Sequence, residues 1–94
     1  MFNEFKSNST ADQFILQTIK DMGMAYELEM KDDDGNDVIK AVKDNNIFYI
    51  SATHPDVEEA NYNIQFLFRG QIEDDFETTD LRYGLEECLN KKIY

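Results

Sequence analysis

The sequence predicts an α+β domain in which a helix, a four-stranded antiparallel meander and a second helix follow one another and pack in two layers. Three observations favour this fold. Apolar residues recur at helical spacing near both ends of the chain, alternation with a period of two runs through its middle, and short turn sequences separate the alternating segments. Because a chain of 94 residues can bury one thin core, we expect residues 1–94 to form a single domain.

The first helix is expected over residues 7–22. Ser9 or Thr10 can cap its N-terminus, and Gly23 can end it because glycine tolerates left-handed backbone geometry. The apolar residues of this segment recur at three and four positions, which places them on one helical face: Ala11, Phe14, Ile15, Ile19 and Met22.

Four strands are expected between the helices, over residues 25–31, 38–43, 47–52 and 61–69. The third is apolar on both faces, which favours a central place in the sheet. The fourth has the clearest alternation, and its apolar positions are Tyr62, Ile64, Phe66 and Phe68. The short connections predict antiparallel pairing of neighbouring strands.

The last helix is expected over residues 79–91, with an apolar stripe of Leu81, Leu85, Cys88 and Leu89. Two interpretations fit the acidic segment before it, residues 71–80. If the segment is helical, Ile72 and Phe76 are buried at a spacing of four and the helix extends backwards. Otherwise it is a solvated acidic loop near a helix N-terminus, where the helix dipole favours negative charge.

The chain is strongly acidic, with 20 Asp and Glu against nine Lys and Arg and a net charge of −11. This charge disfavours direct binding to nucleic acid or to an anionic membrane surface, because both depend on basic residues. It favours a basic protein partner, although excess carboxylate also keeps proteins soluble. The acids are concentrated in the sheet and its connections: residues 53–80 hold eight of them and one base, Arg69.

The candidate partner-binding surface is formed by these carboxylates. Glu27 and Glu29 lie two residues apart on one strand face, about 6.6 Å at strand rise. A row of carboxylates on a rigid sheet can present charge as a phosphodiester backbone does, so a basic nucleic-acid channel would bind the protein in place of its ligand. The full candidate surface is Glu27, Glu29, Asp32, Asp33, Asp34, Asp37, Asp56, Glu58, Glu59, Glu73, Asp74, Asp75, Glu77 and Asp80.

No catalytic residues and no cofactor are expected. His54 is the only histidine and Cys88 the only cysteine, so neither a catalytic triad nor a disulfide or cysteine-rich metal site can be assembled. A structural or merely exposed histidine and a buried thiol are the simpler interpretations. The aromatic residues of the fourth strand lack the Lys and Arg neighbours of a base-stacking platform, which predicts a core role for them.

No dedicated metal site is expected either. In the register of a calcium loop with Gly35 at its sixth position, Met30 and Ala41 would occupy the first and last positions, where carboxylates are needed. Weak binding of divalent ions to the turn at residues 32–37 stays open.

In size, charge and element order, the whole chain resembles the small inhibitors carried by phages and mobile elements, including anti-CRISPR and anti-restriction proteins. It also resembles nuclease-neutralising immunity proteins. The resemblance implies a nuclease or another nucleic-acid-binding protein as the partner. The first residues lack the basic and apolar regions of a secretory signal, so we expect the cytoplasm, which would be the host cytoplasm for a phage-encoded protein.

Two alternatives remain. A small acidic adaptor or secretion-type chaperone would bind through a hydrophobic surface or a homodimer face formed by Phe2, Phe5, Ile93 or Tyr94. A housekeeping domain would need its acidity for solubility alone.

Overall fold

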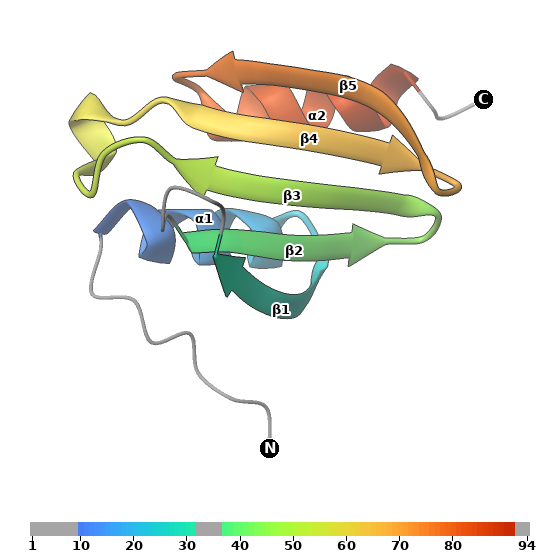
Figure 1. Cartoon of the computed structure of the whole chain (residues 1–94), viewed down its shortest axis with the longest axis horizontal. Coiled ribbons are helices and arrows are strands. Elements are labelled where there is room, and N and C mark those ends of the chain that lie inside the picture. The colour runs from blue at the N-terminus through green and yellow to red at the C-terminus, as the bar shows by residue number, and fades with distance from the viewer. Residues whose placement is uncertain (1–9, 32–36, 92–94) are drawn as a thin grey trace.

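The computed structural model describes residues 10–31 and 37–91, with the backbone alone for residues 27–31 and 91. Within these residues, two helices and five strands follow one another, with one 3₁₀ turn, η1, between β3 and β4 (Figure 1). Their bounds are α1 (Thr10–Asp21), β1 (Ala25–Lys31), β2 (Asp37–Lys43), β3 (Asn46–Ala52), η1 (Val57–Glu59), β4 (Tyr62–Phe68), β5 (Gln71–Thr78) and α2 (Leu81–Lys91).

The strands form one antiparallel sheet in the order β1-β2-β3-β4-β5, and both helices lie on the same face of it (Figure 1). The predicted α+β fold with two layers is therefore confirmed, with five strands in place of four. The strand predicted to be central, over residues 47–52, is β3, which has two strands on each side.

The core lies between the sheet and the helices. Inward-facing residues of neighbouring strands are paired in register, so that Phe48 lies opposite Phe66 and Ile50 opposite Ile64. The Phe48 and Phe66 rings stack with centroids 4.8 Å apart, and both side chains are fully buried. Large aromatic pairs of this kind contribute much of the buried area of a small core.

Helix α1 ends as its sequence favours, one residue before the predicted end at residue 22, and residues 7–9 of the predicted helix lie outside the described residues. Ala11, Ile15 and Ile19 are buried against the sheet, and Gly23 follows the helix with φ of 77°, the left-handed geometry that glycine tolerates. Phe14 was expected on the same face, but it lies at the rim of the core and is 38% exposed, with its ring 5.9 Å from that of Tyr62.

The acidic segment over residues 71–78 is a strand, so neither the helical nor the loop interpretation was right. A β-bulge explains the apolar spacing: Phe66 pairs with Asp74 but Leu67 pairs with Ile72, so Glu73 is an extra residue in β5. The bulge puts Phe76 on the helix-covered side, opposite Ile64, and Ile72 on the open side, where it is 62% exposed.

Helix α2 begins two residues later than predicted because Asp80 caps it. The Asp80 carboxylate accepts a hydrogen bond from the Tyr83 amide at 3.1 Å, which satisfies one of the free N–H groups of the first turn. Gly84 then lets the helix lie close to the sheet. A Cβ at this position would be 2.9 Å from Cγ2 of Thr78 and 3.1 Å from Cδ1 of Ile64.

Candidate protein-binding surface

The register of the sheet brings several acidic segments to one end of the molecule. Ile39 pairs with Ile50, so the start of β2 lies beside the end of β3. Ala52 pairs with Tyr62, and Tyr62 pairs with Thr78, so the start of β4 and the end of β5 are at this end too. It is the left end of the sheet in Figure 1, where η1 and the start of α2 also lie.

Six carboxylates of the candidate surface belong to this end, and we call them the acidic end: Asp37, Asp56, Glu58, Glu59, Glu77 and Asp80. They come from three separate parts of the chain and reach across three interstrand spacings, about 14 Å. Arg82 lies in the first turn of α2, next to this region. Its guanidinium is 3.6 Å from the Glu86 carboxylate on the same helix. Arg69 lies at the opposite end, in the turn between β4 and β5.

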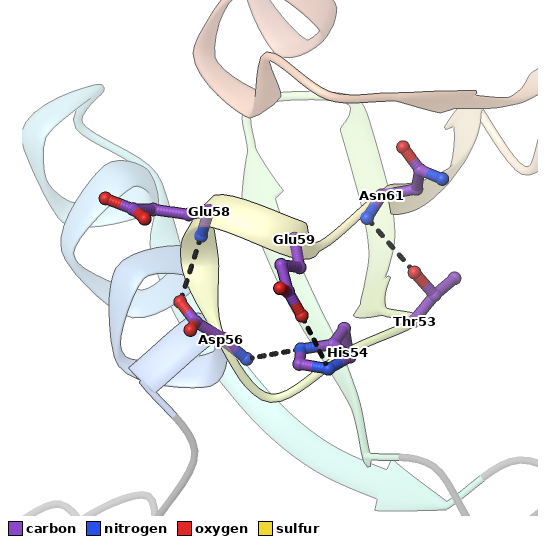
Figure 2. A network of polar contacts seen from close by, with 6 residues as sticks. All are labelled: Thr53, His54, Asp56, Glu58, Glu59 and Asn61. Carbon is purple, nitrogen blue, oxygen red and sulfur yellow. Dashed lines mark hydrogen bonds and ion pairs between the residues drawn. The ribbon is translucent and has the colours of Figure 1, made fainter.

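The connection between β3 and β4 is held in place by its own polar groups (Figure 2). The Thr53 amide donates to the Asn61 carbonyl at 2.9 Å, and the Asn61 amide donates to Oγ1 of Thr53 at 3.0 Å, which closes the loop at its base. Asp56 caps η1, because its carboxylate accepts the Glu58 amide at 3.1 Å. The acids of the connection are therefore carried by an ordered loop.

His54 has a structural part in this loop. Its Nδ1 accepts the Asp56 amide at 3.0 Å, and its Nε2 lies 3.1 Å from the Glu59 carboxylate. With Nδ1 as acceptor, the ring proton is on Nε2, which can donate it to Glu59. Both ring nitrogens thus have partners within the connection, as Figure 2 shows.

The acids of β5 do not form one uniform row. Asp75 and Glu77 are exposed and lie on the open face, opposite Gln65 and Asn63, about 6.6 Å apart at strand rise. Asp74 is opposite the buried Phe66 and is half-buried, and its carboxylate accepts the Asp75 amide at 3.0 Å.

Only part of the predicted surface falls within the described residues. Glu73 is exposed at the bulge, and Asp80 is exposed while it caps α2. The side chains of Glu27 and Glu29, and the whole of Asp32, Asp33 and Asp34, lie outside the described residues. So do the hydrophobic residues proposed for an adaptor interface, namely Phe2, Phe5, Ile93 and Tyr94.

A hollow of about 710 Å³ lies on the open face of the sheet. The sequence did not reveal this hollow, because alternation shows only which residues share a face of the sheet and not whether the described residues leave a hollow there. Its lining combines apolar residues with amides and one carboxylate: Val38, Tyr49, Ser51, Asn63, Gln65, Leu67 and Asp75.

Tyr62 is a second feature that the sequence did not reveal. Its side chain is 1% exposed, and its hydroxyl has no hydrogen-bond partner among the described residues. Burial raises the pKa of the phenol above its ordinary value, and the nearby carboxylates of Asp12 and Asp56 raise it further. The neutral phenol is therefore favoured in the folded protein.

Replacing Tyr62 by Phe is expected to leave the free energy of unfolding near neutral pH unchanged or to raise it, because a buried hydroxyl without a partner costs about 1–3 kcal/mol. The pKa of Tyr62 is raised in the fold from the ordinary 10.0, so the unfolded chain loses this proton first as pH rises. The wild-type protein should therefore lose stability above pH 10.0, relative to Tyr62→Phe, until the pH passes the folded-state pKa. Urea denaturation at neutral and alkaline pH measures both effects. A variant that is clearly less stable at neutral pH would show that the hydroxyl has a partner.

Within the described part of the chain, no three His, Cys, Asp or Glu side chains are grouped as metal ligands, and neither helix is long and apolar enough to cross a membrane. Cys88 is buried in the core, as its place on the helix stripe predicted. No protein-family model, curated protein or solved structure matches the chain.

Proposed function

We propose that this chain is a non-enzymatic acidic protein that binds a basic DNA- or RNA-handling protein in place of its nucleic acid. The observation that carries the proposal is the acidic end, where three separate chain segments bring six carboxylates together. Such convergence depends on the register of the sheet, whereas acids needed only for solubility can lie anywhere on the surface.

Both the charge and the size of the acidic end support this function. Proteins that bind nucleic acid place Lys and Arg against regularly spaced phosphates, and this contact is independent of base sequence. The acidic end covers about 14 Å, which is close to the roughly 12 Å width of the DNA major groove. The backbone of the connection that carries Asp56, Glu58 and Glu59 is already held by hydrogen bonds, so little backbone entropy is lost when a basic surface binds there. Nucleases of the kind that phage-encoded inhibitors neutralise are suitable partners.

Capture on the immobilised protein tests this function. When an extract of the cells in which the protein acts is applied, we expect the immobilised protein to retain a basic nucleic-acid-binding protein at about 0.1 M salt. The retained protein should be released at about 1 M salt, because salt screens exposed charges. Added duplex DNA or RNA should release the same protein by competition. A retained protein that resists both salt and nucleic acid would contradict the proposal.

A second candidate is a small adaptor, and the open face of the sheet favours it. The hollow there has Val38, Tyr49 and Leu67 in its lining, and Ile72 is exposed on the same face. Binding through these residues would be insensitive to salt, because burial of apolar surface would drive it. Loss of capture on replacing Ile72 and Leu67 by Ser, with retention at high salt before the change, would support the adaptor.

A further inference from the structure

β5 is an edge strand, and its outer side faces no other strand in the described part of the chain. It pairs with β4 alone and forms the upper edge of the sheet in Figure 1. A sheet edge presents backbone N–H and C=O groups that can pair with another extended chain, and several families of binding domains use this geometry for peptides. The bulge at Glu73 leaves regular pairing geometry from Asp74 to Thr78.

The side chains of β5 decide which chain can add to this edge. In an antiparallel pair of two β5 strands centred on Phe76, Asp75 of each copy would lie opposite Glu77 of the other. Like charges directly opposite each other destabilise a strand pair, so a second copy of this chain is disfavoured. A strand with basic residues at those positions gains two cross-strand ion pairs instead.

We propose that β5 binds an extended basic segment of the partner as a sixth, antiparallel strand. Two basic side chains, two residues apart, lie opposite Asp75 and Glu77 on the open face, and an apolar side chain between them lies opposite Phe76. The inference deepens the proposed function, because it takes the basic character of the partner from that proposal and adds the mode of binding. An incoming strand that needs the Asp75 amide must displace the Asp74 carboxylate, which now accepts it.

Synthetic peptides test the mode of binding directly. The probe is an end-blocked peptide with the core Lys-Val-Lys-Val-Lys, and two isomers carry two N-methyl groups each, either on the last two Lys residues or on both Val residues. Because successive residues of a strand direct their N–H groups to opposite edges, each isomer blocks one edge while the charge stays constant. We expect one isomer to bind at least about tenfold more weakly than the parent peptide and the other to bind like it. Binding of the parent peptide should slow hydrogen exchange at backbone amides of Gln71–Thr78.

Charge exchange gives the matched control. The double variant Asp75→Lys, Glu77→Lys should lose the Lys-Val peptide and bind the corresponding Glu-Val peptide. The double variant Glu58→Lys, Glu59→Lys has the same net charge, leaves β5 unchanged, and should keep its affinity for the Lys-Val peptide within a few fold.

Three results would overturn the inference. Equal binding of both N-methylated isomers would mean that charge alone holds the peptide. Slower hydrogen exchange at β1 instead of β5 would show that the peptide adds to the other edge of the sheet. An equal loss of peptide affinity in both double variants would show that the overall negative charge of the protein attracts the peptide. None of these results affects capture of a basic partner, so the proposed function can survive them. Conversely, the peptide can add to β5 as a strand even if capture recovers no nucleic-acid-binding protein, in which case only the proposed function fails.

Discussion

Replacing Phe66 by Ala is expected to lower the free energy of unfolding by about 3–5 kcal/mol. Phe66 is 1% exposed and stacks on Phe48 between β4 and the helices, so its removal leaves a cavity that neighbouring strands cannot fill. A domain of this size has a total stability of about 5–15 kcal/mol, so the variant should be close to unfolding at room temperature. Urea denaturation followed by far-ultraviolet circular dichroism measures the loss.

Leu67→Ala is the matched control for this variant. Leu67 is the next residue of the same strand, but it lies on the open face and is half-buried. We expect a much smaller loss there, because few atoms pack around its side chain. A loss as large as that of Phe66→Ala would show that a further layer covers the open face in solution.

Reversing the charge of Glu58 and Glu59 together is expected to weaken binding of the captured basic partner about 100-fold at low salt. Both side chains are exposed on the ordered connection at the acidic end, and neither caps a helix. Reversal places two Lys against a basic surface, so attraction becomes repulsion. The fold should be unaffected, because the pair that is lost, between Glu59 and His54, is solvent-exposed. Titration calorimetry or surface plasmon resonance measures the affinity.

The control has the same net charge and leaves the acidic end intact. Asp21→Lys with Glu86→Lys removes only exposed contacts, namely the Gln17–Asp21 hydrogen bond and the Arg82–Glu86 pair. We expect a loss of only a few fold, since distant exposed charges are screened. If the control lost affinity as strongly as the acidic-end variant, net charge and not the location of the acids would govern binding.

Local sequence signals were sufficient for most of the fold. The alternation over residues 25–31 predicted β1 with its observed bounds, and Gly23 marked the end of α1. β5 was missed because its apolar residues, Ile72 and Phe76, are spaced four apart, which suits one face of a helix. In the structure they lie on opposite faces of a strand, and the bulge that separates them depends on pairing with β4. A bulge is a property of two paired strands, so the spacing of apolar residues within β5 alone does not show it.

Apart from the row at Glu27 and Glu29, the candidate site was predicted from the number of acids in each part of the chain and not from their arrangement in space. Charge counting located the acids in the sheet and its connections, but the meeting of Asp37, Asp56 and Glu77 at one end follows from the register of four strands. Nor could counting separate the structural acids from the others. Asp80 caps α2 and Asp74 accepts a backbone amide, so reversing either would confound binding with stability.

The simple meander order of the sheet has a consequence for how the chain acquires its fold. Each strand pairs with the strand made just before it, so every pairing closes a short loop, at little cost in chain entropy, and folding should be rapid. During synthesis the sheet can therefore grow one hairpin at a time as the chain leaves the ribosome. Each of β2, β3 and β4 is soon covered by its successor, whereas β5 has no later described strand to cover it. Because Asp75 and Glu77 would face like charges in a pair of β5 strands, we expect newly made copies on the same polysome to pair little through this edge.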